Sequence, residues 1–130
     1  MEMEEQIRKY LHQRFTPWLI ILFGSTVKGN THGESDIDIA FLSDKISSEY
    51  EVFMAAQKLA DMLKKEVDLV DLARANTVFR AQVIGDGKVI LDEDPLRRMN
   101  FFMNSYKAYA KLNEERQPIF NRLKDKGVEG

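Results

Sequence analysis

The sequence reads WLIILFGS over residues 18–25 and, after a ten-residue interval, DID over residues 36–38. The apolar run predicts a central strand buried on both faces, and Gly24-Ser25 ends that strand and predicts the start of a short helix. Alternation over residues 36–41 places Asp36 and Asp38 on one face of a second strand and apolar side chains on the other. Two neighbouring carboxylates repel each other unless a cation compensates. The spacing therefore predicts a divalent-metal site beside a turn whose backbone N–H groups can approach a phosphate.

A third carboxylate is available in VDLVDL, residues 67–72, which predicts a further strand. Asp68 shares a face with Val70 and Leu72, whereas Asp71 shares the other face with Val67 and Leu69. The alternation does not say which face meets the Asp36–Asp38 pair, so Asp68 and Asp71 both remain candidates for the third carboxylate. For residues 36–38, the ordinary alternative is a half-exposed strand whose polar face meets water. The glycine turn at Gly24-Ser25, combined with this pair of carboxylates, favours a metal site.

The metal ligands that the sequence offers are oxygen atoms. The chain has no cysteine, and His12 and His32 lie in polar stretches where a solvated side chain is the simplest interpretation. An all-oxygen site favours Mg²⁺ or Mn²⁺ over Zn²⁺. Lys28 follows the glycine turn closely enough to add positive charge to a bound triphosphate, although a solvated loop lysine is an equal alternative. Arg80 could meet the same phosphates or pair with a surface acid.

The remaining elements follow from apolar periodicity and capping signals. Helices are predicted from Met3 to Phe15, from the capping box Ser48–Glu51 to Leu63, from about Asn76 to Ile84, and after Pro95 as a long helix followed by a last helical piece near Gly127. A short strand is predicted from Lys88 to Leu91. The long helix carries an apolar stripe that either packs on the chain's own sheet or forms a partner surface: Leu96, Met99, Phe102, Met103, Tyr106, Tyr109 and Ala110.

Length and charge restrict the class of protein. The 130 residues predict a single domain, and 19 basic against 21 acidic residues, with no long basic block, argue against a protein that grips duplex DNA. The absence of cysteine fits a reducing cytoplasm. The acidic start and an apolar run of only six residues, 18–23, predict neither a signal peptide nor a membrane span.

These motifs resemble the nucleotidyltransferase superfamily that includes the polymerase β-like enzymes. The segments LFGSTVKG (22–29) and SDIDIA (35–40) resemble its minimal MNT-type members, and VDLVDL (67–72), TVFRAQV (77–83) and YAKLNEER (109–116) are similar to the MntA antitoxins that pair with HEPN ribonuclease toxins. The resemblance implies an α/β (α+β) nucleotidyltransferase fold, in which a small mixed β-sheet is flanked by helices and followed by a C-terminal helical extension. It also implies one domain, 1–130, with a catalytic core at about 18–91 and C-terminal helices at about 95–126.

The resemblance further implies an activity and its residues. Gly24 and Ser25 would bind the nucleotide phosphates, Asp36 and Asp38 would hold two Mg²⁺ (or Mn²⁺) ions, and Asp68 would complete the triad. The expected reaction moves AMP from ATP to a tyrosine of a cognate HEPN toxin, which blocks its RNA cleavage, with no direct nucleic-acid binding. The alternatives are nucleotide transfer to a small-molecule acceptor, and an antitoxin that masks its toxin by binding alone.

Overall fold

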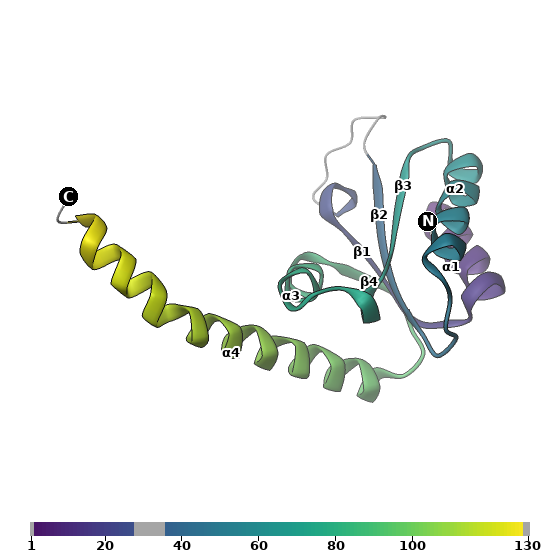
Figure 1. Cartoon of the computed structure of the whole chain (residues 1–130). Helices are drawn as coiled ribbons and strands as arrows, with labels where there is room; N and C mark the ends of the chain where they lie inside the picture. The colour runs from purple at the N-terminus through teal and green to yellow at the C-terminus, as the bar shows by residue number, and fades with distance from the viewer. Residues whose placement is uncertain (1, 28–35, 129–130) are drawn as a thin grey trace.

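A mixed sheet with the strand order β3-β2-β1-β4 forms the centre of the computed structural model, which describes residues 2–27 and 36–128, with side chains up to residue 115 (Figure 1). Along the chain the elements are α1 (Glu2–Phe15), β1 (Pro17–Phe23), the 3₁₀ helix η1 (Gly24–Thr26), β2 (Ile37–Ser43), α2 (Glu49–Leu63), β3 (Val67–Asp71), the 3₁₀ helix η2 (Leu72–Arg74), α3 (Thr77–Asp86), β4 (Lys88–Asp92) and α4 (Pro95–Val128). None of the helices described is both long enough and apolar enough to cross a membrane.

The sheet topology follows from the connections between strands. β1 pairs antiparallel with both β2 and β4, whereas β2 and β3 run parallel. The parallel pair requires a crossover, and α2 provides it. β1 and β2 occupy the two interior positions and β3 and β4 the edges. The expected small mixed sheet flanked by helices is therefore confirmed.

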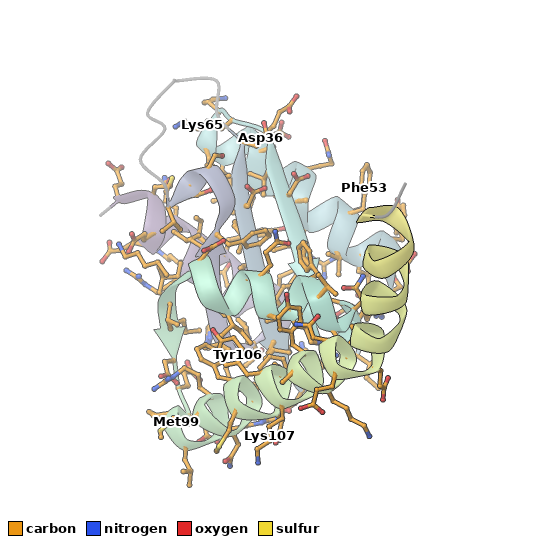
Figure 2. All side chains as sticks on the ribbon, turned by 90° about the vertical axis from the view of Figure 1, so that its left-hand side faces the viewer. Asp36, Phe53, Lys65, Met99, Tyr106 and Lys107 are labelled. Atoms are coloured by element: carbon orange, nitrogen blue, oxygen red, sulfur yellow. The ribbon has the colours of Figure 1, made fainter. Side chains whose placement is uncertain are left out.

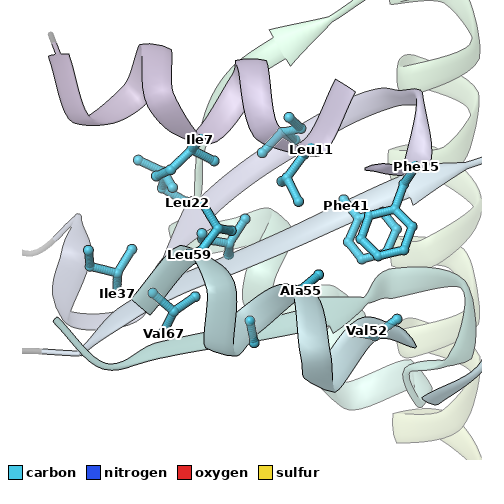
Figure 3. Packing of buried hydrophobic residues seen from close by; sticks show 13 residues of the cluster. Ile7, Leu11, Phe15, Leu22, Ile37, Phe41, Val52, Ala55, Leu59 and Val67 are labelled. Carbon is cyan, nitrogen blue, oxygen red and sulfur yellow. The ribbon is translucent and has the colours of Figure 1, made fainter. Parts of the chain in front are cut away.

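One face of the sheet is covered by α1 and α2. Ile7, Leu11 and Phe15 of α1 are fully buried there, and Phe15 stacks on Phe41 of β2 with ring centroids 4.9 Å apart (Figure 3). The apolar side of β2, which alternation predicted from the sequence, faces this layer. The first helix, which lies outside the expected core segment of about 18–91, thus packs into the same core as the sheet.

The other face is covered by α3 and the first part of α4. Its core contains Leu19 and Ile21 from β1, Ala40 from β2, Leu72 from η2 and Val83 from α3. Because Ala40 belongs to this cluster, the acidic side of β2 also points toward the α3 layer. This face therefore holds any site built on Asp36 and Asp38.

Capping residues mark the predicted helix starts. Ser48 and Glu51 form the predicted capping box at the start of α2, with Ser48 Oγ accepting from the Glu51 N–H at 3.1 Å. Asn76 caps α3 by accepting from the Phe79 N–H at 2.8 Å. These caps satisfy N–H groups that a helix start leaves without partners.

The C-terminal segment is one continuous helix, so the separate last helical piece expected near its end is wrong. Only the first part of α4 packs on α3, and the rest extends away from the sheet (Figure 1). The predicted apolar stripe of α4 packs on the chain's own sheet in one part and is exposed in another. Phe102 contacts the core over the sheet, whereas Met99 and Met103 are 53% and 50% exposed.

Candidate active site

The strand register places Phe23, Asp38 and Asp68 in one row across the sheet. Asp38 pairs with Phe23 of β1 on one side and with Asp68 of β3 on the other. Residues paired in register point to the same face, so the two carboxylates are direct neighbours. Asp36 precedes β2 at the same end of the sheet (Figure 2). This row places Asp68, one of the two candidates for the third carboxylate, beside Asp38.

Asp71 has a different position and different partners. Its carboxylate accepts from the Ala73 N–H at 3.1 Å and lies 3.6 Å from the Arg74 guanidinium. It also shares strand parity with Val67 and Leu69, which pack against the α1–α2 layer. Asp71 therefore caps η2, and Asp68 is the residue beside Asp38.

Gly24 brings the backbone of the turn against the Asp38 carboxylate. Its φ of 64° lies in the left-handed region, and a Cβ built at this position would overlap Asp38 Oδ2. Only glycine meets both requirements without strain. The backbone N–H of the next residue, Ser25, lies near enough to the Asp38 carboxylate to lower its pKa. The turn and the carboxylate thus form one unit.

Two hydroxyl groups join this turn to the start of β2. Ser25 Oγ donates to the Asp36 carbonyl at 3.3 Å, and Thr26 Oγ1 accepts from the Asp38 N–H at 2.8 Å. Sequence reasoning assigned no role to Thr26. A hydroxyl residue directly after a strand-ending Gly-Ser was the available signal, because threonine often bonds backbone groups at turns and helix starts.

The environment of Asp38 disfavours its charge. Burial raises the pKa of the Asp38 carboxyl to about 6, helped next by the adjacent Asp68 and then by Asp36, while the Ser25 N–H acts in the opposite direction. A shared proton or a cation relieves such a pair. The carboxylates therefore provide an electrostatic reason to bind a positive charge at this point.

The donor set fits a divalent cation at the Asp38–Asp68 pair. In the described part of the chain, no three acidic or histidine side chains already surround a common point. Asp38 and Asp68 are adjacent, and Asp36, which precedes β2, is close enough to raise the pKa of the Asp38 carboxyl. Carboxylate oxygens are the ligands that Mg²⁺ and Mn²⁺ prefer, so the chemistry of this donor set fits such an ion.

A hollow of about 210 Å³ lies next to the glycine turn, on the β1 side of Asp38. It is lined by Phe23, Gly24, Phe79, Gln82, Val83 and Asp86. Phe23 and Phe79 meet edge to face with ring centroids 5.6 Å apart. The row thus has an apolar hollow at its β1 end and, among the described residues, an unpaired sheet edge beyond Asp68.

The sequence also singled out Lys28, Arg80 and two histidines. Lys28 and His32 lie outside the described residues, and His12 is exposed, as expected. Arg80 fits neither of its two interpretations. Its guanidinium donates to the Leu72 carbonyl at 3.0 Å and to the Ala73 carbonyl, so it binds the first two residues of η2.

Comparison with known proteins agrees with this geometry. Residues 5–96 match the family model described as polymerase beta, nucleotidyltransferase. A protein adenylyltransferase, MntA, from Shewanella oneidensis is 41% identical over 106 residues, which cover 79% of this chain and 73% of that protein.

Solved structures of toxin–antitoxin complexes have the same fold. A chain from a toxin–antitoxin crystal structure with AMP-PNP superposes with a TM-score of 0.84 and 37% identity, covering 92% of this chain and 97% of its own. A chain from a complex of a tri-AMPylated Shewanella oneidensis HEPN toxin with its MNT antitoxin has a TM-score of 0.79 and 34% identity, covering 93% and 95%.

Proposed function

Since the chain belongs to the polymerase beta nucleotidyltransferase family, we propose that it is an antitoxin that transfers AMP from ATP to a tyrosine of a cognate HEPN ribonuclease toxin and so neutralises it. The observation that carries this proposal is the alignment of Gly24, Asp38 and Asp68 at one end of the sheet. The relatives with this fold support the choice of acceptor, because one is named a protein adenylyltransferase and another is complexed with an AMPylated toxin. The whole chain would act as a single minimal domain.

In this proposal Asp36, Asp38 and Asp68 hold two Mg²⁺ or Mn²⁺ ions. When bound, such ions neutralise the triphosphate and lower the pKa of the attacking hydroxyl. The raised pKa of the Asp38 carboxyl fits this role, because a bound cation offsets both the burial that mainly raises it and the repulsion from Asp68 and Asp36. Asp38 lies between its two acidic neighbours, so it would contribute to both ions.

The turn would position the nucleotide. The backbone of Gly24 and Ser25 can approach the phosphates because position 24 carries no side chain. Lys28 would add positive charge near the triphosphate, as the sequence predicted. Positioning and charge neutralisation supply most of the rate enhancement in phosphoryl transfer.

The reaction is a single displacement at the α-phosphorus. The tyrosine oxygen forms the new bond to phosphorus, the bond to the oxygen bridging the α- and β-phosphates breaks, and pyrophosphate leaves. The phenolic proton passes to solvent at the exposed end of the sheet, where Asp68 is exposed. The products are toxin carrying a tyrosine–AMP phosphodiester and free pyrophosphate.

The test mixes this protein, a cognate HEPN protein, Mg²⁺ and ATP labelled at the α-phosphate. Label on a tyrosine of the HEPN protein supports the proposal, and a folded Asp36→Asn/Asp38→Asn double variant should transfer none. Transfer retained by that variant would refute the carboxylate assignment. Neutralisation without label would identify masking by binding, and label on a small acceptor alone would identify the other alternative.

A further inference from the structure

A groove of about 400 Å³ runs along the free edge of β3, between that strand and α2. We call it the β3-edge groove. Its lining includes Phe53 and Ala56 from α2, Asp68 and Val70 from β3, and Arg74 from η2. Asp68 lines this groove and also belongs to the candidate active site, so the two adjoin at this residue.

The backbone along this groove can pair with another chain. Within the described residues, β3 pairs with β2 and with no other strand, so its outer N–H and C=O groups face the groove. Such an edge is a template for an added extended segment. The five residues of β3 span about 17 Å at the usual rise per residue, which is enough for a short peptide strand.

The groove also offers apolar contact. Phe53 is 57% exposed and projects on the side of the molecule where α2 borders β3 (Figure 2). Val70 is half-buried beside it. A large exposed aromatic side chain next to an unpaired strand is a common element of peptide-binding surfaces.

The position of the groove identifies its occupant. The row across the sheet begins with the glycine turn at β1 and ends with Asp68 at the free edge. If a nucleotide is held at the glycine turn, the β3 side of the row remains available, and the attacking hydroxyl can enter from there. Asp71 and Arg74 pair with each other, which leaves Glu49 and Asp68 to give the groove an acidic character that favours a segment with basic residues.

From these observations we propose that the β3-edge groove binds the acceptor-bearing segment of the partner protein as an added strand on β3, with its tyrosine hydroxyl beside Asp68. The inference rests on the proposed function and specifies how the acceptor reaches the site. It also provides an acceptor-binding surface within the described part of the chain.

The kinetic test replaces Phe53 and measures AMP transfer against partner concentration. Phe53→Glu should raise the KM for the partner about tenfold, because the apolar contact between the aromatic ring and the bound segment is lost. The kcat and the affinity for a non-hydrolysable ATP analogue should stay unchanged. Met54→Glu is the matched control, since Met54 is the next residue of α2, is 43% exposed and does not line the groove. Equal effects of the two variants, or an unchanged KM in Phe53→Glu, would overturn the proposal.

A second experiment does not depend on AMP transfer. A photo-crosslinking residue at position 53 or 54 is irradiated with the partner, and the joined peptides are mapped. Crosslinks from position 53 to a tyrosine-bearing segment, with few from position 54, are expected. If the wild-type protein transfers no AMP, the proposed function fails but this mapping still decides the groove. The absence of crosslinks from position 53 in a complex that forms would exclude the groove as the docking site.

Discussion

The Asp38 carboxylate lies directly over Gly24, and no side chain fits between them. The glycine has a φ of 64°, so both its backbone conformation and its surroundings exclude a Cβ. This contact joins the end of β1 to the acidic row, and in the proposed site it would determine how closely a phosphate on the turn approaches the carboxylates.

Gly24→Ala should therefore damage both stability and activity. The left-handed backbone alone costs about 1–2 kcal/mol for alanine, and the overlap forces Asp38 to move. Urea denaturation measures the first effect and AMP transfer the second. Gly85→Ala is the control, because a Cβ there meets only the Tyr106 hydroxyl at 3.7 Å. Since Gly85 lies within α3, its replacement should stabilise the protein by about 0.5–1 kcal/mol. Similar losses in both variants would contradict this explanation.

The stability of the metal-free protein should depend on pH through the Asp38 carboxyl. Its pKa is 3.8 ordinarily and about 6 in the folded chain, so between these values the folded state binds a proton that the unfolded state lacks. The stability from protonated Asp38 is present below the lower pKa and is lost as the pH rises through the higher one. Asp38→Asn stays neutral, so its melting temperature relative to wild type should rise between about pH 4 and about pH 7.

Melting curves in buffer with a chelator measure this difference. Asp44→Asn is the opposite control, because the Arg97 partner lowers the pKa of the Asp44 carboxyl and its contribution is lost as the pH falls. Added Mg²⁺ above pH 6 should stabilise the wild type more than Asp38→Asn, since ligation favours the ionised carboxylate. A melting difference independent of pH would show that the Asp38 environment has been misassigned.

Substitutions at Asp68 and Asp71 should have different effects. The first should impair catalysis and the second should reduce local stability. Asp68→Asn is expected to lower the kcat about 100-fold or more, because several kcal/mol of charge stabilisation depend on a metal ligand. Asp71→Ala removes the cap of η2 and should lower the free energy of unfolding by about 1 kcal/mol while most of the kcat remains. Steady-state kinetics and denaturation of both variants test this division. The reverse pattern would make Asp71 the third carboxylate.

Thr26 should act as a positioning residue. Thr26→Val keeps the shape but removes the acceptor of the Asp38 N–H, which costs about 1–3 kcal/mol for a group left without a partner. The kcat should fall about tenfold while the affinity for a partner protein stays the same. Thr26→Ser restores the hydroxyl and should recover the activity. Failure of serine to rescue would assign the defect to packing instead.

Local patterns predicted much of this fold. The apolar run 18–23 and the alternation over 36–41 depend only on which residues must be buried, and both strands form where they were expected. The capping box at Ser48 was equally accessible, because its bonds join residues three positions apart. The sequence was less informative for the C-terminal segment, where helix propensity does not say whether one helix continues or two follow each other.

The sequence by itself determined that a glycine turn precedes a pair of carboxylates on one strand face. Only the tertiary structure decided which third carboxylate joins them. The pairing of Asp38 with Asp68 depends on the parallel register of β2 and β3, which the packing of α2 across the sheet determines. Strand alternation has a period of two and contains no information about register between strands, so Asp68 and Asp71 are equivalent until the sheet forms. The same register leaves the β3 edge open beside the site.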